Sequence, residues 1–295
     1  MSTPDPYASV RQRIAEATSA WAGGMTLAEI RDSFERFLGD GAGAPEVTRT
    51  PLEIAGLPAC AFDPPGAAPG RMLLYCHGGG FQIGSIRSHG GLMARIADAG
   101  GMRVLGFDYR LAPEHRFPAA PDDAFAVYSA CVEAGETPLA LVGDSAGGAL
   151  ALGTAMRARD SGLPLPKALV LLSPWLDLTM AGASYVALAE KDIFSKPAQL
   201  KAMARTYLGR EHPPSDPAAS PVLGDLGGLP PMLVHAGGHD ITLDDSHLLA
   251  RNVAAQGGQV EVEVFPGMYH HFQVFEELPE AAASLARIGA FLRAL

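Results

Sequence analysis

The stretch that decides the fold is Leu139-Ala-Leu-Val-Gly-Asp-Ser-Ala-Gly-Gly148, which runs directly into the alanine- and leucine-rich residues 149–158. A short apolar run, a G-x-S-x-G turn and a helical segment follow one another, and this context gives the motif its meaning. Ser145 would stand at a helix N-terminus, where the helix dipole favours developing negative charge. The pattern predicts a nucleophilic serine, and its simpler interpretation is an ordinary N-cap serine.

Short apolar runs bounded by Gly and Pro recur on both sides of this motif, with helix-like segments between them. Continuous apolar runs are typical of parallel strands covered on both faces. Their alternation with helices predicts right-handed βαβ units and one open, mostly parallel sheet, an α/β fold. The predicted strands are Val47–Ile54, Pro58–Phe62, Met72–Cys76, Arg103–Phe107, Leu139–Val142, Ala168–Leu172, Met232–His235 and Val260–Phe265; the predicted helices are 89–99, 121–134, 146–159, 242–256 and 278–294.

Two further segments fall outside this alternation. Residues 5–40 read as helices, with Thr26 and Glu29 forming a capping box ahead of apolar residues at helical spacing. Residues 180–225 carry scattered aromatics and prolines, which indicates an insertion between two strands. The simpler interpretation of 5–40 is a helix packed on the core, and the alternative is a lid over a site.

A second glycine-rich stretch follows another predicted strand. Met72–Cys76 ends in His77-Gly78-Gly79-Gly80-Phe81. Three glycines after a strand free backbone N–H groups to point into a site, where such donors stabilise the anionic oxygen of a tetrahedral intermediate. The second donor expected in this chemistry is the N–H that follows the nucleophile, here Ala146. The sequence therefore predicts an oxyanion hole, against the alternative of a plain flexible loop.

A serine hydroxyl needs a base, and the base needs a carboxylate that orients it. Asp240 lies just past a predicted strand and before a helix, which makes it the expected acid; Asp244 and Asp245 are expected to be solvated residues of that helix's first turn. His270 and His271 follow the last predicted strand, and one of them is the expected base. For the histidines away from this position and from the glycine-rich loop, a structural or solvated role is expected.

The composition excludes several classes of function. Lys+Arg total 22 and Asp+Glu total 32, and the net charge of −10 argues against nucleic-acid partners and against an anionic membrane surface. With 48% hydrophobic and 18% charged residues, the chain can bury a sizeable core. Three cysteines exclude a disulfide framework. Residues 1–13 contain no apolar stretch typical of a secretory signal, so a cytoplasmic protein is expected.

Metal and cofactor chemistry are the competing interpretations of the motifs. His235, His239 and Asp240 together with the 270–271 pair could gather metal ligands, but no H-E-x-x-H or C-x-x-C spacing occurs. The glycines at 39, 41 and 43 follow a helix rather than a strand, so they do not fit a dinucleotide-binding turn. We therefore expect no metal and no organic cofactor.

Four stretches together resemble the hormone-sensitive-lipase-like family of bacterial esterases, within the α/β-hydrolases. Residues 77–81 match the family's HGGGF and residues 143–148 its GDSAGG. Residues 108–120, DYRLAPEHRFPAA, and 173–178, SPWLDL, match two further family segments. The resemblance runs from about residue 70 to the C-terminus. The chain departs from the family's HGF motif with His270-His271-Phe272, and it lacks the usual proline after the acid.

The resemblance implies an α/β-hydrolase fold, with an eight-stranded, mostly parallel sheet, one antiparallel strand near its start, helices on both faces and a helical cap. It implies that residues 1–46 supply N-terminal cap helices and that 47–295 form the catalytic domain, with a cap insertion at about 180–225. Asp240 takes the place of the catalytic acid and His270 that of the base. Gly79 and Gly80 would donate with Ala146 to the oxyanion.

The resulting functional hypothesis is a serine carboxylesterase that hydrolyses small uncharged short-chain esters through an acyl-enzyme. A lactone hydrolase or an amidase would use the same triad, and a ligand-binding relative without turnover is the alternative from another class. Phe81, Ile241 and Phe272 are candidates to line an acyl pocket. Dimers are common among similar proteins, so a homodimer is one possible oligomeric state. Neither a nucleic-acid partner nor a membrane partner is expected.

Overall fold

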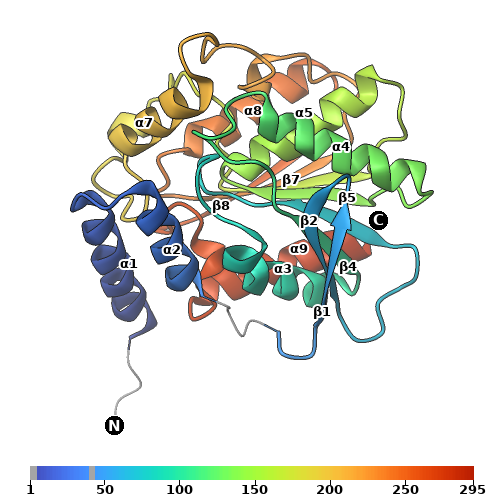
Figure 1. Cartoon of the computed structure of the whole chain (residues 1–295), viewed down its shortest axis with the longest axis horizontal. Coiled ribbons are helices and arrows are strands. Elements are labelled where there is room, and N and C mark those ends of the chain that lie inside the picture. The colour runs from blue at the N-terminus through green and yellow to red at the C-terminus, as the bar shows by residue number, and fades with distance from the viewer. Residues whose placement is uncertain (1–4, 40–43) are drawn as a thin grey trace.

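The computed structural model describes residues 5–39 and 44–295. Its described residues form one eight-stranded sheet in the order β1-β2-β4-β3-β5-β6-β7-β8 (Figure 1). The strands are β1 Thr48–Ile54, β2 Leu57–Asp63, β3 Met72–Cys76, β4 Arg103–Phe107, β5 Ala140–Asp144, β6 Ala168–Leu172, β7 Met232–Gly237 and β8 Val260–Phe265. All eight correspond to predicted runs, which confirms the expected α/β-hydrolase fold.

β2 is the strand that breaks the parallel order. It pairs antiparallel with β1, with Thr48 opposite Asp63, and antiparallel with β4, with Ala59 opposite Phe107. Every later pair, from β3 with β4 to β7 with β8, is parallel. The carboxyl ends of β3 and β5 to β8 therefore meet at one edge of the sheet, where ligands bind in open parallel sheets.

Helices cover both faces of the sheet (Figure 1). α3 Ile86–Gly100 and α9 Pro279–Arg293 pack on one face, where Leu73 and Val142 point. α4 Ala119–Glu133, α5 Ala146–Asp160 and α8 Leu243–Ala255 pack on the other, with Leu74 and Leu141. Because side chains alternate between the faces of a strand, the wholly apolar central strands supply both halves of the core.

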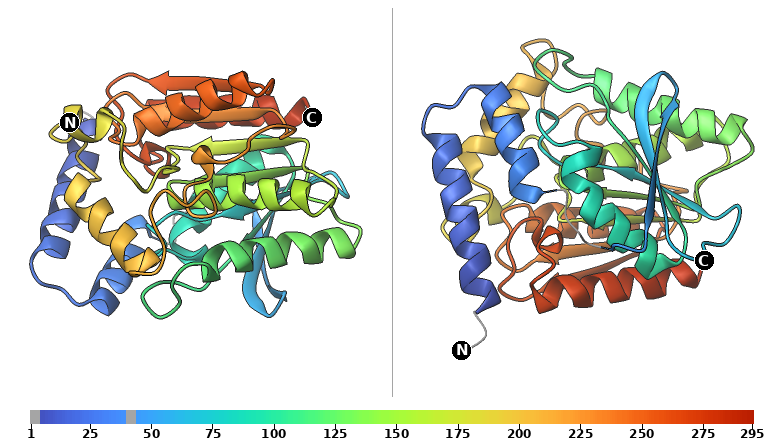
Figure 2. Two further views of the ribbon diagram at one scale, coloured as in Figure 1. Left: turned by 90° about the horizontal axis from the view of Figure 1, so that it is seen from above. Right: turned by 60° about the horizontal axis from the view of Figure 1, so that its bottom comes forward.

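The two N-terminal helices and the insertion after β6 lie side by side at one end of the sheet (Figures 1 and 2). The helices are α1 Pro6–Ala22 and α2 Leu27–Leu38; the insertion holds α6 Ser184–Ala187, α7 Pro197–Leu208 and the 3-10 helix η1 Pro221–Leu223. α2 begins with the predicted capping box between Thr26 and Glu29. Aromatic contacts join the two segments: the Trp21 and Phe37 rings lie 6.5 and 6.1 Å from the ring of Phe194.

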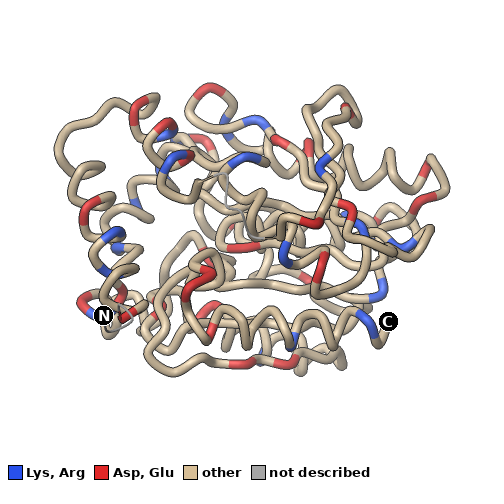
Figure 3. Tube along the Cα trace, turned by 90° about the horizontal axis from the view of Figure 1, so that it is seen from below, with Lys and Arg blue, Asp and Glu red and all other residues tan. Residues whose placement is uncertain are grey.

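The surface shows no segregation of charge. Acidic and basic positions are mixed around the described chain (Figure 3). Within the described residues, no helix is both long enough and apolar enough to cross a bilayer.

Candidate active site

Ser145 sits in the turn between β5 and α5, in a strained backbone conformation. Its φ is 50° and its ψ is −122°, outside the regions that a residue with a side chain prefers. The flanking glycines make the turn possible, because a Cβ on Gly143 would lie 2.2 Å from the Gly147 carbonyl oxygen, and one on Gly147 would lie 2.0 Å from the Cys76 carbonyl oxygen. The turn places Ser145 at the first position before α5, and its side chain makes no cap hydrogen bond to the helix.

Three segments bring a hydroxyl, an imidazole and a carboxylate into line. His270 Nε2 lies 2.8 Å from Ser145 Oγ, and His270 Nδ1 lies 2.9 Å from Asp240 Oδ1. Asp240 follows β7 and His270 follows β8, so both come from the carboxyl-end edge of the sheet. The N–H and the hydroxyl of Thr242 also donate to Asp240 Oδ1, at 2.8 and 2.9 Å. All three aligned residues are buried.

A second carboxylate lies next to this line. Asp192, from the insertion, is fully buried. One of its carboxylate oxygens lies within 4.8 Å of a carboxylate oxygen of Asp240 and of a ring nitrogen of His270. Asp192 accepts the N–H groups of Phe194, Ser195 and Ile241, which ties the insertion to the loop after β7. Burial disfavours the charged imidazole and by itself would lower the pKa of His270. The negative charges of Asp240 and Asp192 have the larger effect, and they raise the pKa of His270 above its ordinary value.

The glycine-rich loop after β3 is held against the serine turn. Asp144, the residue before Ser145, accepts the N–H of Gly78 at 3.0 Å and the hydroxyl of Tyr75 at 2.6 Å through Oδ1. A Cβ on Gly78 would lie 2.0 Å from Asp144 Oδ2, so only glycine allows this approach. Tyr109 also holds the loop, because its hydroxyl donates a hydrogen bond of 2.8 Å to the His77 carbonyl oxygen.

Gly79 and Gly80 continue this loop in left-handed conformations, with φ of 110° and 60°. Both line the same cavity as Ser145 and His270. Among the hydrogen bonds of the described residues, none uses the N–H of Gly79 or of Gly80, so both donors are free. Ala146 is the first residue of α5, whose opening N–H groups have no partner within the helix. Gly79 and Gly80 therefore border the cavity that holds Ser145, and Ala146 directly follows Ser145 in the chain.

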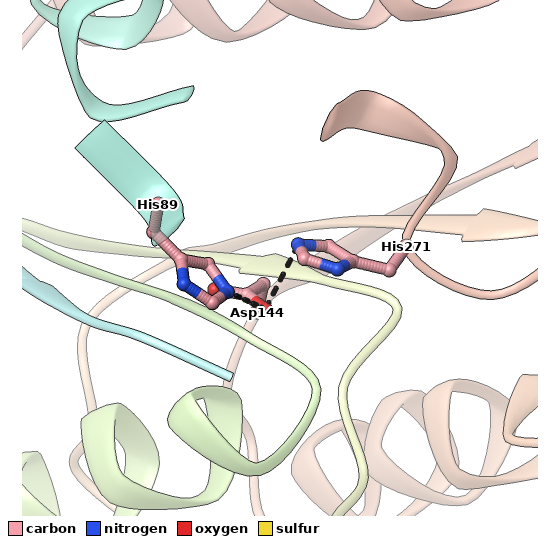
Figure 4. A group of neighbouring side chains, drawn as sticks. All are labelled: His89, Asp144 and His271. Carbon is pink, nitrogen blue, oxygen red and sulfur yellow. Dashed lines mark ion pairs between the residues drawn. The ribbon is translucent and has the colours of Figure 1, made fainter. Parts of the chain in front are cut away.

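The second histidine of the pair, His271, contacts a different carboxylate. Its Nε2 lies 2.9 Å from Asp144 Oδ2, and His89 Nε2 from α3 lies 3.4 Å from the same oxygen (Figure 4). Burial disfavours the charged forms, yet these two imidazoles hold the pKa of Asp144 well below its ordinary value. The imidazole adjacent to Ser145 Oγ is therefore that of His270, while His271 braces the turn that carries Ser145.

The cavity beside Ser145 is small, about 40 Å³. Residues from α1, α2, the insertion, the glycine-rich loop and the 270–271 pair surround it. They are Trp21, Phe34, Gly79, Gly80, Ile83, Ser145, Phe194, Ser195, Gln199, Leu200, Met203, His270 and His271. The N-terminal helices and the insertion thus both reach the serine.

None of the three predicted pocket residues is among those lining residues. The Phe81 ring stacks on Tyr207 at 3.9 Å, on the wall of a separate cavity of about 540 Å³. Ile241 is fully buried in the core, and Phe272 packs against Phe265, with ring centroids 5.0 Å apart. Their neighbours in sequence belong to the site, but Ile241 and Phe272 pack in the core and Phe81 borders the other cavity.

One expectation about the acid region is wrong. Asp244 is partly exposed, but Asp245 is buried at 1% exposure. It accepts the N–H groups of Leu176 and Asp177 and the hydroxyl of Tyr185. Burial, in spite of these bonds, raises the pKa of Asp245 to about 8. The helix turn that begins α8 faces the segment after β6 rather than solvent, and local sequence carries no signal of that packing.

Two groups of described residues bring three metal-ligating atoms within 4.8 Å, namely Asp192–Asp240–His270 and His89–Asp144–His271. In the first group the imidazole already bonds Ser145 and Asp240. In the second, both imidazoles approach one Asp144 oxygen whose carboxylate also holds Gly78 and Tyr75. The second group is thus held by ion-pair contacts to Asp144 Oδ2, and the first by the hydrogen bonds of His270.

Known proteins share both the sequence and the fold. Residues 73–274 match the family model described as the α/β hydrolase fold. Over 232 residues, 78% of this chain and 77% of the other, the chain is 41% identical to an acetyl-hydrolase of Streptomyces hygroscopicus. It is 35% identical to an esterase of Acinetobacter venetianus over 254 residues, 85% of this chain and 84% of the other. The crystal structure of an esterase from the bacterial hormone-sensitive lipase family matches with a TM-score of 0.94 at 39% identity, over 100% of this chain and 99% of that one.

Sheet order, helix placement and the family match define an α/β-hydrolase. Within that class, the chain belongs to the hormone-sensitive-lipase-like family of bacterial esterases.

Proposed function

We propose that this chain is a serine carboxylesterase that hydrolyses small, uncharged, short-chain acyl esters. The observation that carries the proposal is the unbroken line from Ser145 Oγ through His270 to Asp240, with contacts of 2.8 and 2.9 Å. A nucleophile, a base and an orienting carboxylate in this relation are the requirements of acyl transfer.

In the proposed mechanism His270 Nε2 takes the hydroxyl proton as Ser145 Oγ attacks the ester carbonyl carbon. Asp240 holds the imidazole by its Nδ1–H and stabilises the charged ring that forms. The N–H groups of Gly79, Gly80 and Ala146 receive the negative oxygen of the tetrahedral intermediate. His270 then protonates the leaving alcohol, and an acyl-enzyme remains on Ser145. In the second half of the reaction, His270 takes a proton from a water molecule as the water attacks the acyl carbonyl carbon. His270 then returns the proton to Ser145 Oγ, and the carboxylic acid product is released.

The expected substrate size follows from the surroundings of the serine. The cavity of about 40 Å³ has room for only a small group, and Trp21, Phe34 and Phe194 give it apolar walls. We propose that residues 1–46 and 180–225 act together as the cap, because side chains from both segments line this cavity. The net charge of −10 disfavours anionic substrates through long-range repulsion. The names acetyl-hydrolase and esterase, carried by the relatives above, agree with a short acyl group.

Hydrolysis of p-nitrophenyl butyrate by the parent protein and by Ser145→Ala tests the proposal. We expect the substitution to lower kcat by about three orders of magnitude or more, because a triad without its nucleophile retains only residual catalysis. A fluorophosphonate should label the parent at Ser145 and leave Ser145→Ala unlabelled. Activity of Ser145→Ala within tenfold of the parent would refute the proposal. Binding of an ester without turnover or labelling would instead favour the ligand-binding relative.

A further inference from the structure

His271 has a backbone conformation that favours glycine. Its φ is 59° and its ψ is 30°, in the left-handed region that few residues with a side chain adopt. A glycine here would satisfy the backbone and leave no side chain beside Ser145. The chain instead has an imidazole at this uncommon position, and the contacts around the ring explain how it is held.

Several contacts fix that imidazole in place. Its Nε2 lies 2.9 Å from Asp144 Oδ2, and its ring stacks on His89 with centroids 5.3 Å apart (Figure 4). The backbone N–H of His271 donates to Ser173 Oγ at 3.1 Å. His89 is itself held by Ser88 Oγ, 3.0 Å from its Nδ1. The ring is buried at 3% exposure, so it forms a rigid wall rather than a mobile side chain.

The ring of His271 belongs to the cavity that holds the serine and the base. His271 lines the 40 Å³ cavity together with Ser145 and His270. In the proposed mechanism His270 Nε2 must face the leaving alcohol oxygen, so the alcohol group lies beside the 270–271 pair. Phe194 closes the same side, with its ring 6.4 Å from that of His270 and 6.3 Å from that of His271.

We propose that His271 is a specificity-determining residue that limits the size of the alcohol group of the ester. The inference rests on the proposed esterase function. The imidazole fills space that a glycine backbone would leave open, so small alcohols bind and longer ones collide with the ring. The acyl group lies on the other side of the reacting carbonyl and is not limited by this residue.

Two ester series measured on purified variants test the inference. The first varies the alcohol, from ethyl acetate to hexyl acetate; the second keeps the small ethyl alcohol and varies the acyl group, from ethyl acetate to ethyl octanoate. Acid release is followed by pH-stat in both. In His271→Gly we expect the kcat/KM ratio of hexyl to ethyl acetate to rise by about tenfold or more, the size of effect that apolar pocket contacts produce. The acyl-series ratio should stay within about threefold.

Matched variants separate size from folding and from ion pairing. His271→Gln keeps a side chain of similar length and should keep the parent's alcohol ratio. His271→Asn is small and tolerates the left-handed conformation, so it should behave as His271→Gly does. An unchanged alcohol ratio in both small variants, or a change confined to the acyl series, overturns the inference. Loss of folded protein in both small variants, followed by circular dichroism, would assign the ring a structural role and overturn it as well.

Failure of the inference about His271 can be distinguished from failure of the proposed esterase function. If the parent neither reacts with a fluorophosphonate nor hydrolyses any ester, the esterase proposal fails. If the parent turns over ethyl acetate and the ratio does not move in the small variants, only the inference about His271 fails.

Discussion

His270 Nε2 and Ser145 Oγ lie 2.8 Å apart although 125 positions separate them in the sequence. The contact exists because β5 and β8 run in the same direction within one sheet, so the loops after both strands lie at the same edge. Four consequences of this arrangement can be measured.

His270→Asn should lower kcat/KM for p-nitrophenyl butyrate by about three orders of magnitude, because Ser145 loses its base. His247→Asn is the matched control, since His247 is 43% exposed on α8 and its ring contacts only Asp244 among the ion pairs. The control should keep the parent's rate. A His270→Asn enzyme as active as His247→Asn would exclude His270 as the base.

Asp192→Asn should move the acid limb of the pH–rate profile to lower pH. Catalysis needs the neutral imidazole, so activity falls as the pH drops through the pKa of His270. Burial opposes that pKa, while Asp240 and Asp192 raise it. Burial raises the pKa of Asp192 to about 6, so its carboxylate is charged at pH 8. Removing that charge lowers the pKa of His270 and should raise the relative rate at pH 8 by about threefold.

The profile of kcat/KM between pH 6 and 10 checks this prediction, because that range brackets the pKa of His270, which the neighbouring carboxylates raise to about 9. Glu190→Gln, on the exposed surface of the same insertion, is its control and should leave the limb in place. A limb that stays in place in Asp192→Asn as well would mean that Asp192 acts only through its backbone hydrogen bonds.

Gly79→Ala should reduce kcat by about a hundredfold, the effect of losing one oxyanion donor. The added Cβ would lie 2.1 Å from the Ile83 carbonyl oxygen at a φ of 110°, so the loop must shift. Gly153→Ala in α5 adds a Cβ that meets nothing within 4 Å and serves as the control. KM should change less than kcat in Gly79→Ala. A parallel loss of thermal stability in Gly79→Ala with unchanged kcat would count against the donor role.

Asp245→Asn should make stability less dependent on pH. Burial raises the pKa of Asp245 to about 8 in the folded protein. The stability contribution of the protonated group is therefore complete below the ordinary Asp pKa of about 4 and is lost as the pH rises toward 8. An asparagine can accept the two backbone N–H groups and donate to Tyr185 without a charge.

Melting temperatures at pH 5 and pH 8 measure the effect. The parent should lose several degrees more than Asp245→Asn between these two values, since about 1 kcal/mol corresponds to about 2–4 °C for a domain of this size. An equal loss in both proteins would show that Asp245 stays charged in the folded state.

Sequence patterns identified every strand and the principal helices because their signals are local. Apolar runs such as Met72–Cys76 and Ala168–Leu172 are buried on both faces, and Gly or Pro marks their ends. The glycines at 143 and 147 likewise predict the serine turn, because a Cβ at either position would collide with a neighbouring backbone carbonyl. For the base, the residues left His270 and His271 open, and only the resemblance to a family favoured His270.

The side chains that surround the serine could not be found in this way. Asp192 lies in an insertion without periodicity, and nothing local distinguishes it from a solvated carboxylate. Asp245 was expected in solvent because its helix turn looks polar, yet it binds the backbone of 176–177. Phe81 and Phe272 are next to site residues in sequence, yet both rings are buried away from the cavity that holds Ser145, against Tyr207 and Phe265.

By itself, the sequence determined the order of strands and helices, the turn at Ser145 and the glycine-rich loop after β3, because apolar runs and glycine motifs are visible within short stretches of the chain. Only the tertiary structure decided which imidazole meets Ser145, which carboxylates are buried and which aromatic rings wall the cavity. Those outcomes depend on how distant segments stack across the sheet edge, and that packing leaves no periodic trace in the chain.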